Sequence, residues 1–150
     1  MVSSSSDKTV LVHHIDDAEK HCRLGGHGQS DVTSLLHIGG SHRNGIGDRD
    51  EGRYYRDSII CSGNAEGSIL VYSVESIFGA LSSAGSEVDS LFSLKGHKAK
   101  VTGLCLSNSS EVPLLFSVSS DGYLRSWLLS EREAGAINTD INDLTSSIES

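Results

Sequence analysis

Short apolar runs separated by turn-forming residues dominate the pattern of hydrophobic and polar positions along the chain. The runs "KVTGLCLS" at residues 100–107 and "VPLLFSVS" at 112–119 are rich in β-forming residues and predict strands. Asp121-Gly122 is a strong signal for a two-residue hairpin turn. Apolar residues fall on both faces of the runs at 59–61 and 114–116, which favours sheets that are covered on both sides. The pattern therefore predicts an all-β protein of short, stacked sheets.

This strand pattern occurs three times along the chain. The segments "SSDKTVLVHH" at 5–14, "NAEGSILVYS" at 64–73 and "SSDGYLRSWL" at 119–128 each contain an acidic residue followed by a strand-like run. In each case a serine stands four residues before the acid, and a ring-bearing residue stands six residues after it. The matched sets are Ser3, Asp7 and His13, then Ser62, Glu66 and Tyr72, then Ser117, Asp121 and Trp127.

A second motif precedes two of these segments. The stretches at 23–38 and 93–107 share L-x-G-H followed by V-T-x-L, which places His27 and His97 at matched positions. Ordered recurrence of both motifs is hard to obtain by chance. We therefore interpret the chain as a series of tandem units.

The order Gly-His, Ser-x-x-x-Asp, Trp resembles the WD-repeat β-propeller family over about residues 1–130, and the last unit matches best. In that family the His, Ser or Thr, Asp and Trp of one blade form a hydrogen-bonded tetrad. The resemblance implies a structural tetrad in the third unit, with degenerate sets in the first two units, where Glu66 and Tyr72 depart from the pattern. The implied sets are His97, Ser117, Asp121 and Trp127; His27, Ser62, Glu66 and Tyr72; and Ser3, Asp7 and His13.

The fold expected from this resemblance is a partial propeller of about three blades, each with up to four antiparallel strands, in an open ring. The blade units span about 1–25, 26–94 and 95–130, and a flexible insertion occupies 39–56. A second insertion, at 75–88, separates the third and fourth strands of the second blade and begins with a short helix at 76–81. We expect residues 131–150 to form a disordered acidic tail, with an outer strand around 136–141 as the alternative.

Charge and composition narrow the classes of partner. The formal net charge is −8 and the positive charges are scattered, so the sequence predicts no nucleic-acid binding. No stretch approaches the roughly 20 apolar residues of a membrane span, and no apolar signal-peptide core follows the first methionine. The three cysteines are too widely spaced for a disulfide framework. These features predict a cytoplasmic or nuclear protein that is neither secreted nor bound to a membrane.

The function implied by the resemblance is a non-catalytic scaffold that binds other proteins and needs no cofactor. Ser117 lies within a strand and not on a G-x-S-x-G elbow, which argues against a hydrolase triad. The first insertion offers candidate partner contacts, since Tyr and Arg are favoured interface anchors; they are Arg53, Tyr54, Tyr55 and Arg56. The alternative hypothesis is a metal- or ligand-binding module built on the histidine-rich first forty residues, although no His-x-x-x-His or Cys-x-x-Cys spacing occurs there.

The opening "MVSSSSDKTVLVHH" corresponds to the second and third strands of a blade whose first strand and Gly-His are absent. We therefore expect the protein to begin within a blade, as a fragment or truncated form of a larger propeller would. Three blades are fewer than the 4–8 that close a propeller ring. The chain is then expected to be marginally stable alone, to oligomerise, or to pair with another chain that completes the ring.

Overall fold

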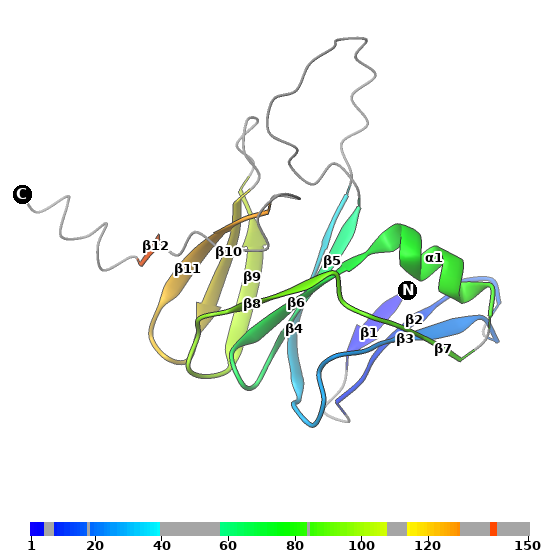
Figure 1. Ribbon diagram of the computed structural model, residues 1–150, viewed down its shortest axis with the longest axis horizontal. Coiled ribbons are helices and arrows are strands. Elements are labelled where there is room, and N and C mark those ends of the chain that lie inside the picture. Colours follow the sequence, from blue (N-terminus) through cyan, green and yellow to red (C-terminus); the bar gives the residue numbers. More distant parts are fainter. Residues whose placement is uncertain are drawn as a thin grey trace, which may run out of the picture.

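The computed structural model describes the backbone of residues 1–4, 8–17, 19–39, 58–83, 85–107, 114–129 and 139–140. These residues form three four-stranded sheets that lie in a row, with one sheet between the other two (Figure 1). None of the three sheets closes into a barrel, and one short helix is present among the described residues. The prediction of an all-β protein built from stacked sheets is confirmed at this level.

The middle sheet has the strand order β4-β5-β6-β8 and is antiparallel throughout. Its strands are β4 (Val32–Ile38), β5 (Ile59–Asn64), β6 (Ser68–Ser73) and β8 (Phe92–Lys95). All six residues of β5 and the central four of β6 are buried. The apolar residues on both faces of β5 and β6 thus reflect a sheet that is covered on both sides.

Two separate cores flank the middle sheet, and alternate residues of β5 and β6 face each of them. Ile60, Leu70 and Tyr72 belong to the core shared with the first sheet. Residues one position away belong to the core shared with the third sheet; they are Ile59, Cys61, Ile69 and Val71.

The first sheet has the order β1-β2-β3-β7. Its strands are β1 (Val2–Ser4), β2 (Val10–His13), β3 (His21–Leu24) and β7 (Ser86–Val88). The third sheet has the order β12-β11-β10-β9, from β9 (Val101–Leu106), β10 (Leu114–Ser119), β11 (Leu124–Leu128) and β12 (Thr139–Asp140). In strand order β1 corresponds to β5 and β10, so the described part of the first sheet has no counterpart of β4 or β9.

The hairpins β1–β2, β5–β6 and β10–β11 share one register. Ser3 pairs with Leu11, Ser62 with Leu70 and Ser117 with Arg125, so each matched serine faces the residue eight positions further along. The tandem units recognised in the sequence are therefore structurally equivalent at these positions.

The second insertion differs from the expected loop with a short helix. Helix α1 (Val74–Leu81) begins directly after β6, is capped by the Ser73 side chain, and buries Ile77 and Leu81. The chain then adds β7 to the first sheet, parallel to β3, with Cys22 opposite Ser86. The prediction of purely antiparallel blades is wrong for this sheet, because the segment fills the free hydrogen-bonding edge of β3. In Figure 1 the connection crosses from the middle sheet to the first.

Two residues of the expected acidic tail, Thr139 and Asp140, form β12 and pair with β11. This corresponds to the alternative of an outer strand, since the outer edge of β11 offers unpaired backbone groups. The other residues of 131–150 lie outside the described part of the chain. So does the insertion at 39–56 apart from Gly39.

The middle and third sheets approach closely where their turns meet. Gly67 has a φ of +87°, and a Cβ there would lie 2.5 Å from the carbonyl oxygen of His97. On the neighbouring strands, the Thr33 hydroxyl donates to the carbonyl of Val101 at 2.6 Å. These contacts fix the position of His97 relative to the middle sheet.

Candidate functional site

The third sheet holds a buried polar group at the start of its hairpin. His97 precedes β9, Ser117 lies on β10 and Trp127 lies on β11, and all three are buried. Trp127 Nε1 donates to Ser117 Oγ at 2.7 Å, and His97 Nε2 lies 2.8 Å from the same oxygen. The Ser117 hydroxyl therefore links the Trp127 ring on β11 to His97, which precedes β9.

Asp121, in the β10–β11 turn, completes this group. Its Oδ2 lies 3.1 Å from His97 Nδ1 and accepts the Lys98 N–H at 2.8 Å, and its Oδ1 accepts the Tyr123 N–H at 3.0 Å. Desolvation by itself would raise the pKa of Asp121, but the two backbone hydrogen bonds and His97 outweigh it and lower this pKa to about 2. The ionised carboxylate can only accept, so Nδ1 of His97 carries a proton and orients the ring.

The second set is only partly assembled. His27 Nε2 lies 2.6 Å from Ser62 Oγ, as in the third sheet. Tyr72, which occupies the tryptophan position, donates its hydroxyl to the Gly25 carbonyl at 2.6 Å, and burial raises its pKa to about 12. The histidine, serine and ring-bearing residues thus come together between the first and middle sheets.

Glu66 has no hydrogen bond to His27 in the structure, and Nδ1 of His27 has no hydrogen-bond partner. In its place Asn64 stabilises the turn, since its Oδ1 accepts the N–H groups of Glu66 and Ser68. The imidazole is 5% exposed and lacks a carboxylate partner, so desolvation lowers the pKa of His27 to about 4.

Shortening Glu66 to aspartate, as at the equivalent Asp121, is expected to complete this group. The E66D variant should raise the pKa of His27 and increase the free energy of unfolding by about 1–2 kcal/mol, because a charge-assisted hydrogen bond would satisfy Nδ1. An NMR titration of the imidazole and urea unfolding would measure both. The control E66Q keeps the longer side chain and should change stability by less than about 0.5 kcal/mol; equal effects of the two variants would contradict this expectation.

The first set does not form a comparable group. Ser3 lies on exposed β1 and His13 on β2, and both belong to the face of the first sheet that points away from the middle sheet. The His13 ring lies 5.9 Å from that of His21. Asp7 lies outside the described residues, as do the candidate contacts Arg53, Tyr54, Tyr55 and Arg56.

The geometry of the third set shows what its Ser, His and Asp do. Ser117 is 1% exposed, and its oxygen is bonded to both Trp127 and His97. A nucleophilic serine needs access to a substrate carbonyl and a nearby oxyanion hole. Here the hydroxyl is enclosed between two sheets, where it satisfies buried polar atoms.

The histidines of the first forty residues have different neighbours, apart from the adjacent rings of His13 and His21. Cys22 faces the core, His27 bonds Ser62, and His37 lies near the Ser58 hydroxyl. Within the described ranges, no group of three or more His, Cys, Asp or Glu side chains could hold a metal ion.

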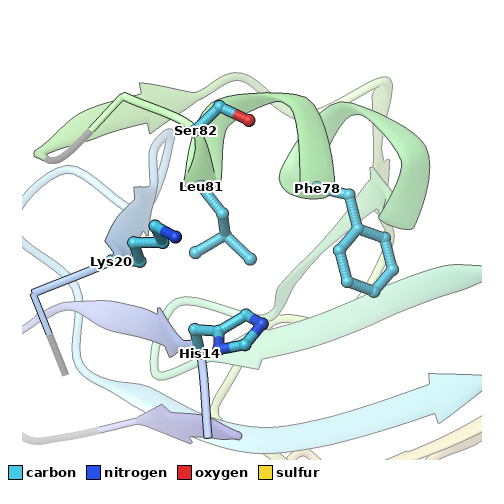
Figure 2. A pocket seen from close by; sticks show the side chains of 5 residues that line it. All are labelled: His14, Lys20, Phe78, Leu81 and Ser82. Carbon is cyan, nitrogen blue, oxygen red and sulfur yellow. The ribbon is translucent and has the colours of Figure 1, made fainter. Parts of the chain in front are cut away.

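A pocket of about 430 Å³ lies between α1 and the β2–β3 connection (Figure 2). His14 and Lys20 line one side, and Phe78 and Leu81 of the helix and its C-cap residue Ser82 line the other. Lys20 is already paired with Asp17 at 3.2 Å, and both side chains are solvent-exposed. The pocket exists because α1 crosses to the first sheet. The apolar pattern of the second insertion did not predict this crossing.

The outer face of the third sheet is apolar, and no other described sheet covers it. Leu115 and Trp127 point to the core, so the alternate residues Leu114, Phe116 and Val118 point outward. Leu124 lies opposite Val118, and the exposed Cys105 lies opposite Phe116. We call this surface the third-sheet outer face; its residues are Cys105, Leu114, Phe116, Val118 and Leu124.

The outer face of the first sheet is also partly apolar. Val10 and Val12 point to the core, which leaves Leu11 and His13 on the other side beside Ser3. Met1, joined to His13 by backbone hydrogen bonds, is 71% exposed. We call this surface the first-sheet outer face; its residues are Met1, Ser3, Leu11 and His13.

The described residues define an all-β protein with two buried polar groups between its sheets and two outer faces that no other described sheet covers. The chain matches no known protein-family model, and no curated protein resembles it in sequence at a significant level. None of the helical residues in the described part of the chain forms a segment long and apolar enough to span a membrane.

Proposed function

We propose that this protein is a non-catalytic protein-interaction module of the WD-repeat type, a partial propeller that binds other proteins through its uncovered sheet faces. The observation that carries the proposal is the third-sheet outer face. Phe116 is half-buried and Val118 is 39% exposed on this face, which forms one side of a four-stranded sheet. Contiguous apolar surface of this kind marks a docking site.

The internal repeat indicates what such a face contacts. By the shared hairpin register, Leu114, Phe116 and Leu124 are equivalent to Ile59, Cys61 and Ile69 of the middle sheet. Those three residues are buried against the third sheet. The third-sheet outer face therefore repeats a surface that this fold already covers with another sheet, and a sheet-like protein surface is the partner class that it fits.

The buried polar groups support a scaffold role. His97, Ser117, Asp121 and Trp127 satisfy one another's hydrogen bonds and fix the hairpin, so they serve the framework that presents the faces. Cys22 and Cys61 are buried free thiols, and burial raises the pKa of Cys61 to about 12. Unreactive free thiols fit a reducing compartment, and we place the protein in the cytoplasm or nucleus.

The test compares Val118→Arg with a matched control, Phe78→Arg on α1, whose side chain is 64% exposed away from this face. Tagged wild type and both variants would be cross-linked in cells and the bound proteins quantified by mass spectrometry. We expect V118R to capture about tenfold less of the proteins that bind specifically to the wild type, because a charge at the centre of an apolar interface is costly. F78R should capture them at the wild-type level. Binding that is equal in all three chains, with folding intact by circular dichroism, would overturn the proposal.

A further inference from the structure

The two outer faces carry complementary features, and we infer that the third-sheet outer face of one copy docks on the first-sheet outer face of a second copy. The inference rests on the proposed function, since it names the partner of the same docking surface. It follows from comparing the outer faces with the interface between the middle and third sheets.

That internal interface supplies the template. One side is the face of the middle sheet formed by Ile59, Cys61 and Ile69, and the other contains Leu115 and Trp127 of the third sheet. The equivalents of the first side are on the third-sheet outer face. The equivalents of the second side, at the same register positions, are Met1 and His13 of the first-sheet outer face.

The exposed apolar residues follow this equivalence. Met1 is 71% exposed, whereas Ile60 and Leu115 at the matched positions are 4% and 0% exposed. Leu11 is half-buried on the first-sheet outer face, and Leu70 at the matched position is 5% exposed. The position of Met1 is thus buried in both other sheets, whereas the position of Leu11 is buried at Leu70 and only half-buried at Arg125 of the third sheet.

Side-chain size favours a copy of this chain over an arbitrary sheet. Phe116 and Val118 occupy the positions of Cys61 and Gly63, so the third-sheet outer face is bulkier than its middle-sheet counterpart. In the internal interface, a Cβ on Gly63 would lie 2.7 Å from a methyl group of Val101 on β9. The described first sheet has no counterpart of β9. The described strands of the first sheet therefore place no equivalent of the Val101 methyl group against these larger residues.

The contact joins two different surfaces, so it is head-to-tail and leaves one outer face free at each end until a ring closes. Two copies bring together six of the described sheets, which lies within the 4–8 blades of closed propellers, whereas three copies would bring nine. The expected assembly is a dimer in which each outer face is covered by the other chain.

The experiment is sedimentation velocity of the full chain over a range of concentrations. We expect wild type and F78R to sediment as a dimer at twice the 15.9 kDa chain mass. Val118→Arg and Leu11→Glu should each raise the dissociation constant about tenfold or more, because each places a charge in one of the two surfaces. Mixing the two variants should restore 1:1 association, since one unaltered pair of faces remains and the other pair joins Arg to Glu.

A wild-type chain that stays monomeric at all concentrations would overturn the inference, as would V118R and L11E that fail to associate when mixed. Circular dichroism of each variant separates lost association from lost folding. If the chain is monomeric yet its cellular partners depend on Val118, the proposed function stands and this inference fails. If neither self-association nor partner binding depends on Val118, both fail.

Discussion

Replacing Trp127 with alanine is expected to lower the free energy of unfolding by about 3–5 kcal/mol. The indole is fully buried between the middle and third sheets, where it packs in the same core as Ile69 and Leu115. Its removal opens a cavity and leaves the Ser117 hydroxyl without the donor that now contacts it at 2.7 Å. Urea unfolding followed by circular dichroism measures the loss, because the chain has no other tryptophan to report fluorescence.

Trp127→Phe separates packing from hydrogen bonding. Phenylalanine retains a buried ring but has no N–H group, so we expect a smaller loss of about 1–2 kcal/mol. A loss below about 1 kcal/mol for W127A, or a larger loss for W127F than for W127A, would contradict the placement of the indole between the sheets. Since the free energy of unfolding of a single domain is about 5–15 kcal/mol, W127A should remove a large part of it.

The second large effect is on the pH dependence of stability. His27 has a folded-state pKa of about 4 against an ordinary value of 6.5, because burial disfavours its charged form. Between these values the unfolded chain binds a proton that the folded chain does not. The contribution of His27 is therefore constant above pH 6.5, and stability falls as the pH drops from 6.5 to 4, by about 3 kcal/mol in total.

Urea unfolding at a series of pH values would measure this fall, with His27→Gln as the control. Glutamine can still bond Ser62 but does not titrate, so the difference in unfolding free energy between the two chains should change across this window. A difference that is independent of pH would show that His27 is not the group responsible. Asp121 acts at a lower pH: its pKa is lowered to about 2, so its contribution is present above about pH 3.8 and is lost as the pH falls through 2.

Much of the fold could be predicted from residue patterns. The paired apolar faces of β5 and β6 follow from their unbroken apolar runs, and the Asp121-Gly122 turn from its dipeptide. The equivalence of Ser3, Ser62 and Ser117 was visible as a spacing and is reproduced as a hairpin register. These features are local, so neighbouring residues suffice to specify them.

The α1–β7 crossing could not be predicted in the same way. The helix itself was expected, and its buried pair Ile77 and Leu81 has helical spacing. The three residues of β7 carry no distinctive pattern, and they form a strand only because the edge of β3 is free to pair with them. The pocket beside His14 follows from that crossing.

Part of the candidate site could also be predicted from the sequence, and part could not. The sequence placed His97, Ser117, Asp121 and Trp127 in one group on the strength of a resemblance, and their hydrogen bonds join them in space. It could not show that Glu66 leaves Nδ1 of His27 without a partner, because that depends on the distance between two turns. The outer faces also needed the structure, since the apolar pattern of β10 is the same whether or not another sheet covers it.

The sequence by itself determined the all-β class and the three hairpins, because strand periodicity and turn chemistry act over a few residues. The residues of the complete polar group were expected only from the resemblance to a family. Only the tertiary structure decided which faces of those sheets are buried. Burial depends on which segments distant in the chain meet, as with β7 on β3 or Gly67 on His97. Whether a given apolar residue belongs to a core or to an outer sheet face is therefore settled by packing and not by its position in the repeat.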